Sequence, residues 1–208
     1  MSVEKATTRR YELRKRADAM EATRQRITEA AVELHGSVGP ARTTITAIAE
    51  RAGVQRQTVY RHFPTEDDLF TACSQHFYEG DRWPDPERWR AIADPAERLA
   101  AALDELYAYY ERTEPMFSNV LRDAELVDFA RDAVAPLQAY LDEAAQALTG
   151  GRPARGRRRQ LLKRALRHAL AFSTWHSLTT NGIGRSDAAK LVTALVEAAS
   201  APDGHESV

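Results

Sequence analysis

Apolar residues along this chain recur at spacings of three and four, which place them on one face of an α-helix. Clear stripes of this kind begin at Ile27, Leu99 and Ala188. Runs in which β-branched and polar residues alternate between turn dipeptides, the usual mark of strands, do not occur. The pattern predicts an all-α protein.

A long helix and a short one are predicted first. The turn-forming stretch 36–40 ends the helix that contains Ile27. Thr44 is placed to cap a short second helix. Gly53 follows at a position where a chain leaving a helix often needs positive φ. These signals predict a tight turn of about three residues after the second helix.

A third short helix is predicted over residues 56–62. It ends at Phe63-Pro64, because the residue before a proline is pushed out of the α region. Thr65 then starts another helix, whose acidic first turn, residues 66–68, suits the positive end of the helix dipole. That helix is predicted to end near Gly80.

Proline marks several positions in the C-terminal part. Asp94 before Pro95 is a helix start, and Pro115 repeats that signal. Pro136 is expected to break or kink the helical stretch in which it lies.

Two further helices are predicted to complete the chain. The first runs from about residue 157 to 180, and at ~1.5 Å per residue it would exceed ~30 Å. Gly182 and Gly184 end it. The second is capped by Ser186 or Asp187.

These elements divide the chain into three parts. Roughly the first dozen residues are rich in Arg and Lys but lack a periodic apolar face, which predicts a flexible basic arm that runs into a helix. This basic arm is assigned to residues 1–20. Residues 21–80 form a domain of short helices. Turn formers in residues 80–86 mark the boundary to a helical domain over residues 81–208.

Composition limits the classes of protein to which the chain can belong. Its 208 residues, 43% of them hydrophobic, can bury a sizeable core. No apolar run approaches the ~20 residues needed to cross a bilayer, and none follows the basic N-terminus to form a signal peptide. A cytoplasmic protein without a membrane partner is expected. The single Cys73, among apolar neighbours at helical spacing, is expected to be a buried, reduced thiol.

The net charge of −1 hides an asymmetry along the chain. Residues 1–62 hold 12 Lys and Arg against 7 Asp and Glu, a balance of +5, and the remainder carries −6. A basic block of this size is what neutralisation of nucleic-acid phosphates requires. A merely solvated basic face is the alternative.

The segment from Thr44 to His62 has the residues that a helix-turn-helix needs. Ala49 is small where the two helices cross, Gly53 lies at the turn, and Val54 and Val59 lock the second helix. That helix presents base-edge readers and phosphate donors with no acidic residue: Gln55, Arg56, Gln57, Thr58, Tyr60, Arg61 and His62.

This segment resembles the tetracycline-repressor (TetR) family of regulators. The family's spacing is matched by Ile27, Ala30, Ala31, Leu34, Thr43-Thr44, Ile48-Ala49, Ala52-Gly53-Val54, Thr58-Val59-Tyr60, His62-Phe63-Pro64 and Leu69. Residues 172–178 resemble one branch of the family more weakly. The family usually has a lysine shortly after Phe-Pro, where Glu66, Asp67 and Asp68 lie here. A phosphate contact is thereby lost, and weaker or more salt-sensitive DNA binding is expected.

The resemblance implies an N-terminal three-helix helix-turn-helix domain followed by a helical ligand-binding and dimerisation domain. Thr44, Tyr60 and His62 would contact the sugar-phosphate backbone of double-stranded DNA. Gln55, Arg56, Gln57 and Thr58 would approach base edges in the major groove. Core packing is the alternative for Tyr60, and simple solvation is the alternative for Arg61.

The resemblance also implies a homodimer and a small-molecule effector. Small and branched apolar residues would form the dimer seam: Leu162, Ala165, Ala169, Leu191, Leu195 and Ala199. Mostly aromatic residues would line a cavity for a largely apolar effector: Tyr107, Tyr110, Met116, Phe117, Phe129, Phe172, Trp175 and His176. Core packing within one chain is the alternative for both sets.

Other classes of function have less support in the sequence. His168 and His176 lie eight residues apart, too far for shared metal coordination without other ligands, and no motif for a cofactor or a nucleophile occurs. No enzyme, metal or cofactor is therefore expected. The main rival is a small-molecule binding protein with only non-specific DNA affinity. Catalysis in a helical cavity is a second rival, without a paired acid and base to support it.

Overall fold

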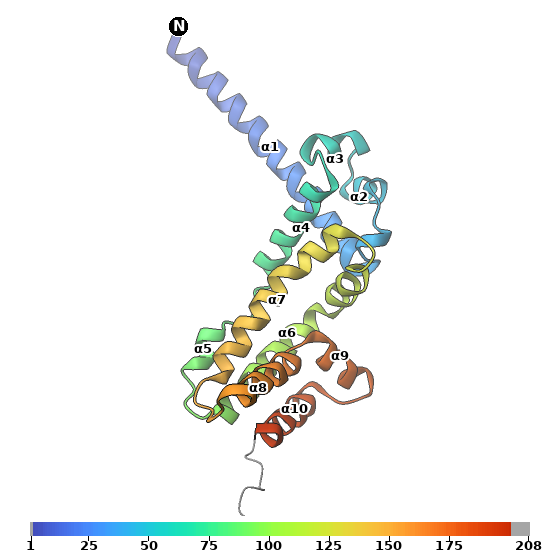
Figure 1. Ribbon diagram of the computed structural model, residues 1–208. Helices are drawn as coiled ribbons and strands as arrows, with labels where there is room; N and C mark the ends of the chain where they lie inside the picture. Colours follow the sequence, from blue (N-terminus) through green and yellow to red (C-terminus); the bar gives the residue numbers. More distant parts are fainter. Residues whose placement is uncertain (1, 201–208) are drawn as a thin grey trace, which may run out of the picture. The chain divides into compact units, whose positions relative to one another are not determined.

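The computed structural model describes residues 2–200 and, within them, the side chains of residues 11–198. All regular elements in residues 2–200 are helices, which confirms the all-α prediction (Figure 1). The chain divides into two compact units. The N-terminal unit consists of Met1–Asp81 and Ser118–Ala133, and the C-terminal unit consists of Arg82–Phe117 and Val134–Val208.

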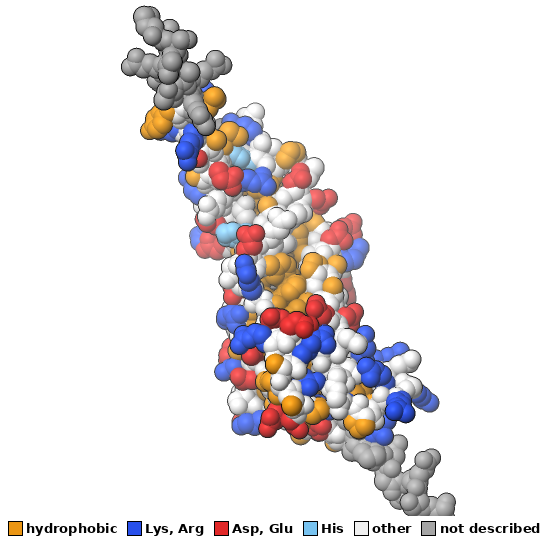
Figure 2. All heavy atoms as spheres, turned by 90° about the vertical axis from the view of Figure 1, so that its left-hand side faces the viewer, with side chains coloured by type: hydrophobic (Ala, Val, Ile, Leu, Met, Phe, Trp, Pro, Cys, Tyr) orange, Lys and Arg blue, Asp and Glu red, His pale blue; other side chains and the backbone are white. Residues whose placement is uncertain are grey.

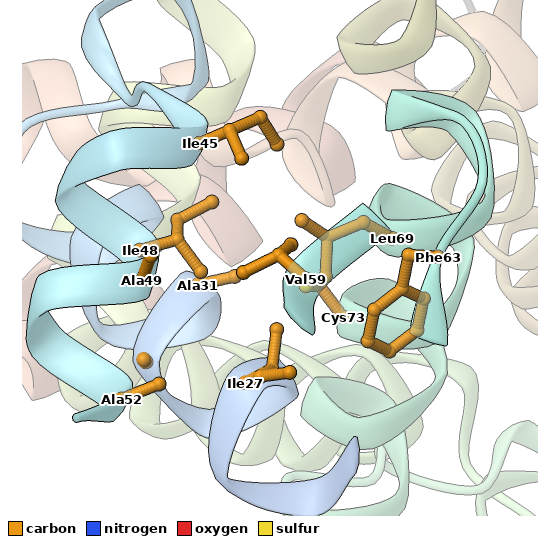
Figure 3. Close-up of a cluster of buried hydrophobic side chains, with 11 residues drawn as sticks. Ile27, Ala31, Ile45, Ile48, Ala49, Ala52, Val59, Phe63, Leu69 and Cys73 are labelled. Atoms are coloured by element: carbon orange, nitrogen blue, oxygen red, sulfur yellow. The ribbon is translucent and has the colours of Figure 1, made fainter. Parts of the chain in front are cut away.

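The N-terminal unit contains the predicted short helices. Its elements are α1 (Ser2–Ser37), the short 3-10 helix η1 (Pro40–Arg42), α2 (Ile45–Ala52), α3 (Arg56–His62) and α4 (Glu66–Gly80). α1 packs against α2 and α4, and α2 packs against α3. Figure 3 shows apolar side chains from these helices converging on one core, with Val59 among them. Ile27, Ala31 and Val59 are fully buried there.

Local capping sets the ends of α2 and α4. The backbone N–H of Ala47 donates to Thr44 Oγ1 at 3.1 Å, and Gly53 ends α2 with φ 66°. Thr65 and Asp68 form a capping box at the start of α4, in which each side chain bonds the other residue's backbone N–H. The predicted helix starts at Thr44 and Thr65 and the predicted glycine turn at Gly53 are confirmed.

The basic arm that was predicted to run into a helix is itself helical, because α1 extends from Ser2 to Ser37. Residues 11–22 are exposed, so packing against other helices does not hold this segment in a helix. It is rich in Arg, Lys, Glu, Leu and Ala, and it contains neither Gly nor Pro. These residues have high intrinsic helix propensity, which an analysis of apolar periodicity does not register.

The described part of the C-terminal unit contains six helices, two of which are shared with the N-terminal unit. The six are α5 (Pro86–Arg90), α6 (Pro95–Asp123), α7 (Asp128–Thr149), α8 (Gly156–Ala169), α9 (Phe172–Thr180) and α10 (Arg185–Ser200). The last turns of α6 and the first turns of α7 belong to the N-terminal unit. Within residues 2–200, no helix combines the length and the apolar character needed to span a membrane.

The single helix predicted over residues 157–180 is two helices, α8 and α9, because the chain breaks after Ala169. Two side chains of α6 bond the backbone carbonyls at the break. Tyr107 Oη donates to the carbonyl of Ala169 and Tyr110 Oη to that of Leu170, each at 2.8 Å. The break is therefore held by residues some sixty positions earlier in the chain. No glycine or proline lies near residue 170 from which the break could be predicted.

Two prolines predicted to start or interrupt helices lie inside them. Pro115 is within α6, and Pro136 is within α7. On either side of Pro115, the rings of Tyr109 and Phe117 pack together with centroids 5.7 Å apart, and both are buried. This packing of buried rings favours a continuous helix, although a proline in a helix interior typically costs about 3 kcal/mol.

Candidate nucleic-acid interface

α3 presents a polar surface while one residue anchors it to the core. Val59 is completely buried, whereas Arg56, Gln57 and Tyr60 are exposed. Most of the predicted DNA contacts surround a shallow hollow of about 470 Å³: Gln55, Gln57, Thr58, Tyr60 and Arg61. The structure thus brings together five of the eight predicted residues on one side of a short, rigidly held helix.

Arg24 of α1 fixes the C-terminal end of α3, and sequence analysis missed it. Its Nη1 donates to the carbonyl of His62 at 2.8 Å. Its guanidinium also lies over the ring of Phe63, 4.1 Å from the centroid. Arg24 therefore bonds a helix-end carbonyl and covers the buried ring that follows α3. The sequence carries no local signal that distinguishes Arg24 from the neighbouring arginines of α1.

Arg56 and Tyr60, one turn apart on α3, contact each other. Arg56 Nη2 donates to Tyr60 Oη at 3.2 Å, and the guanidinium lies 5.6 Å from the ring centroid. Tyr60 is 39% exposed. This contact holds Arg56 along the exposed face of α3 before any DNA is bound.

His62 is half-buried at the end of α3. Burial lowers the pKa of its imidazole, and the nearby cations Arg61 and Arg24 lower it further, while Glu21 opposes them. The ring is therefore neutral at pH 7, where it has one N–H donor for a phosphate oxygen.

At the N-terminus of α4, side chains of the first turn bond backbone N–H groups of the same turn. Asp68 Oδ2 accepts from the backbone N–H of Thr65 at 3.1 Å and from its hydroxyl at 2.7 Å. The N–H of Asp68 donates in turn to Thr65 Oγ1. The N–H groups of Thr65 and Asp68 are therefore engaged within the turn. Thr44 is exposed, and although its oxygen caps α2, its hydroxyl proton remains available for donation.

The turn after α1 is bonded to the last turns of α6, within the same unit. Asn119 Nδ2 donates to the carbonyl of Gly36 at 2.8 Å, and the N–H of Ala41 donates to Asp123 Oδ2 at 2.9 Å. Burial alone would raise the pKa of Asp123, but hydrogen bonds from Arg122 and Ala41 outweigh it and lower that pKa. No local sequence pattern predicts this connection, because it joins residues more than eighty positions apart.

Five of the predicted effector residues form a packed aromatic cluster in the C-terminal unit, which His176 borders. The buried members are Tyr107, Tyr110, Phe117, Phe172 and Trp175. Ring centroids of Tyr110 and Phe172 lie 5.3 Å apart, and those of Phe172 and His176 also lie 5.3 Å apart. Trp175 Nε1 is buried without a hydrogen-bond partner among the described residues.

The remaining predicted effector residues lie elsewhere or contribute less. Phe129 belongs to the N-terminal unit, where its ring centroid is 4.6 Å from that of Phe70. Met116 is half-buried on α6. The structure therefore groups six of the eight residues and places Phe129 in the other unit.

The predicted dimer residues differ in exposure. Leu162 and Ala169 are buried within the C-terminal unit, and Ala165 is half-buried. Leu191 and Leu195 of α10 are 41% and 60% exposed. Ala199 lies outside the residues whose side chains are described. Among the described predicted residues, Leu191 and Leu195 are those that expose a large apolar side chain.

Comparison with known proteins supports this description. Residues 27–73 match the model of bacterial regulatory proteins, tetR family. The HTH-type transcriptional regulator SrpR of Pseudomonas putida is 35% identical over 114 residues, which cover 52% of this chain and 49% of that protein. The uncharacterized HTH-type transcriptional regulator TtgW, also of Pseudomonas putida, is 34% identical over 114 residues, covering 52% of this chain and 78% of TtgW. The match thus spans about half the length of SrpR.

Solved structures share the fold over most of the chain. A TetR-like transcriptional regulator from a Rhodococcus species superposes with a TM-score of 0.66 at 22% identity, covering 87% of this chain and 97% of that one. NalD, described as the secondary repressor of the MexAB-OprM multidrug efflux pump in Pseudomonas aeruginosa, gives 0.64 at 21% identity and covers 88% of this chain and 97% of its own.

The chain belongs to the tetR family of bacterial regulatory proteins. It is a transcriptional regulator with an N-terminal helix-turn-helix, as the resemblance of residues 43–64 predicted.

Proposed function

We propose that the protein is a cytoplasmic, ligand-responsive repressor that binds a palindromic DNA operator as a homodimer. The observation that carries the proposal is the exposed polar face of α3. Gln55, Gln57 and Arg61 line one hollow there, and the buried side chain of Val59 anchors α3 to the core. A face of donors and amides without a carboxylate suits the major groove of DNA.

The side chains on this face divide into two proposed roles. Arg56 and Gln57 read base edges, since Arg pairs with guanine O6 and N7, and Gln pairs with adenine N6 and N7. Tyr60 and His62, together with Thr44, donate to backbone phosphates. The hydrogen bond between Arg56 and Tyr60 links the roles, because a phosphate that accepts from Tyr60 also helps to position Arg56.

A second copy is proposed to cover the exposed leucines of α10. Leu195 borders a shallow groove of about 470 Å³ between α8, α9 and α10, and Ala165 and Val192 also line it. Exposed leucines beside such a groove favour an isologous contact, in which the same surface serves both copies. A two-fold arrangement would place two α3 helices about 34–36 Å apart, so that they enter successive major grooves.

The aromatic cluster is proposed as the effector site. Its rings provide apolar surface, and the unpartnered Trp175 Nε1 would donate to an acceptor on the effector. Because Tyr107 and Tyr110 hold the α8–α9 break, an effector that separates these rings would move the start of α9. The proposed sign of regulation, repression, follows the description of the structurally similar NalD.

Selection of bound DNA from a random pool at moderate salt tests this function. An inverted repeat whose half-sites lie about one helical turn apart is the expected result. Salt-dependent retention without a shared sequence would contradict it, and would instead favour a binding protein with only non-specific DNA affinity.

A further inference from the structure

A second cluster of basic residues lies in the C-terminal unit, and its arginines have no role in the proposed function. Residues 144–186 contain no Asp or Glu, whereas eight Arg and Lys lie between Arg152 and Arg167. Figure 2 shows Lys and Arg side chains gathered in the lower right of the face that it draws. The balance of −6 after residue 62 therefore conceals a local excess of positive charge.

A groove of about 890 Å³ opens at the start of α8 within this segment. Arg152, Arg157 and Arg158 supply its cationic lining. Leu161 and Leu162 are among the apolar residues that line it. The first turn of α8 holds no acidic residue, and no side chain caps its N-terminus. One groove thus combines guanidinium groups, a positive helix end and an apolar wall.

The acidic residues that line the groove are already engaged. Asp94 accepts hydrogen bonds from the backbone N–H groups of Ala96 and Glu97, at 2.9 and 2.8 Å, at the start of α6. Glu197 accepts from Arg152 at 2.5 Å. Both carboxylates are thus engaged with donors of the groove wall, and the three arginines outnumber the two carboxylates that line the groove.

The side chain of Arg152 carries a buried hydrogen-bond donor without an acceptor in the part of the chain that the structure describes. Only 5% of its side chain is exposed, and its Nη2 donates to the carbonyl of Pro95 and to Glu197. Its Nε is buried and has no hydrogen-bond partner among the described residues. A buried charged donor without an acceptor is unfavourable, and an acceptor in the groove would relieve this. Because Nε is covered, the guanidinium has to turn toward the groove, in competition with Glu197.

We propose that this groove binds a small organic anion with an apolar body, of the chemical class of medium-chain carboxylates. The carboxylate accepts from Arg152 and Arg157 at the positive end of α8, and the hydrocarbon packs against Leu161 and Leu162. This binding requires neither DNA nor an effector in the aromatic cluster. It is therefore tested separately from the proposed function.

The experiment is calorimetric titration of the full chain with octanoate, octanamide and acetate. Octanamide has the same hydrocarbon without the charge, and acetate has the charge without the hydrocarbon. We expect saturable binding of octanoate, with octanamide and acetate each at least tenfold weaker. Equal binding of octanoate and octanamide, or of octanoate and acetate, would overturn the proposed ligand class.

Matched variants locate the site. Arg157→Gln removes a cation that lines the groove, and Arg159→Gln removes an exposed cation from the same turn of α8 that does not line it. We expect Arg157→Gln to weaken octanoate binding about tenfold and Arg159→Gln to change it less than twofold. Equal losses would show diffuse attraction to a basic surface, and no loss in either would place octanoate elsewhere, such as the aromatic cluster. Either result overturns the proposal.

Glu197→Gln tests the competition at Arg152. It removes the carboxylate that holds Nη2 while keeping the shape of the side chain. Octanoate binding is expected to become several-fold tighter, whereas a purely structural role for the Arg152–Glu197 pair predicts unchanged or weaker binding. Thermal unfolding of each variant verifies that it is folded at the temperature of titration.

Discussion

The two units of this protein end their helices by different means. In the N-terminal unit, Thr44, Gly53 and Thr65 set the ends of α2 and α4 through contacts with residues at most four positions away. In the C-terminal unit, the end of α8 is held by Tyr107 and Tyr110, which lie 62 and 60 positions from the carbonyls they bond. Local rules therefore describe the DNA-binding unit, while the other unit depends on contacts between distant residues.

The cores of the two units also differ in the side chains that fill them. Small and branched side chains such as Ala31, Ala49 and Val59 allow α1, α2 and α3 to approach closely. The C-terminal unit instead buries a set of aromatic rings whose hydroxyl groups bond backbone atoms. Substitutions in the N-terminal unit are expected to act mainly on DNA binding, and those in the C-terminal unit mainly on stability and ligand binding.

Truncating one buried ring in each unit gives the largest expected effect. Phe63→Ala and Phe172→Ala each remove a buried phenyl group, at a cost of roughly 3–5 kcal/mol of unfolding free energy. Under conditions where both variants remain folded, only Phe63→Ala should abolish DNA binding, because Phe63 also carries the contact with Arg24. Urea unfolding and DNA titration measure the two effects. Equal loss of DNA binding would remove the distinction between the units.

A buried histidine makes the N-terminal unit sensitive to acid. Burial lowers the pKa of His35 to about 4, against an opposing effect of Asp123. The unfolded chain therefore takes up this proton first, so stability is complete above pH ~6.5 and falls as the pH decreases toward 4, by about 3 kcal/mol. Urea unfolding between pH 7 and pH 4 measures the loss.

His35→Phe serves as the control for this prediction. The phenyl ring can keep the tilted contact with Phe70, in which the ring centroids of His35 and Phe70 lie 5.2 Å apart, but it cannot be protonated. Its unfolding free energy should vary much less over the same pH range. An unchanged pH dependence in the variant would assign the acid sensitivity to other groups.

Removing a hydroxyl at the helix break tests the distant contacts of the C-terminal unit. Tyr110→Phe leaves the carbonyl of Leu170 without its donor, which is expected to cost about 1–3 kcal/mol of unfolding free energy. Tyr11→Phe, at a tyrosine that is 68% exposed, should change stability by less than about 0.5 kcal/mol. Denaturant unfolding distinguishes them, and equal effects would show that the Tyr110 hydroxyl does not hold the break.

The smallest expected effect separates the two roles on α3. Arg56→Ala should reduce discrimination at one base position by about 1–3 kcal/mol, whereas Tyr60→Phe should weaken binding to all sequences by about 1 kcal/mol. Titration of each variant against the selected operator and its single-base substitutions gives the two profiles. Identical specificity profiles would contradict the assignment of Arg56 to base readout.

Much of the N-terminal unit was predictable because its information is local. The Thr44 cap, the Gly53 turn and the inward direction of Val59 each follow from a residue type at a position within one helix turn of its partner. Arg24 was not predictable in this way. Its partners His62 and Phe63 lie almost forty positions away, and nothing in the spacing of an exposed basic helix distinguishes this arginine from its neighbours.

The C-terminal unit was predicted less accurately for the same reason. Pro115 and Pro136 carry strong local signals for a helix start or interruption, yet both lie inside the continuous helices α6 and α7. Of the residues predicted for the dimer seam, Leu162 and Ala169 are buried in the single chain, whereas Leu191 and Leu195 are exposed. Periodicity identifies an apolar face but not the surface that covers it.

The sequence by itself determined the helical fold class, the helix-turn-helix, its family and the polar residues that α3 exposes, because short-range capping and periodic burial encode all of these. The tertiary structure alone decided where α8 ends, which arginine supports α3, and which cations gather around the groove at the start of α8. These features depend on side chains brought together from distant positions. Closing such long segments of chain is favourable only when many contacts form at once, so no single local pattern can predict them.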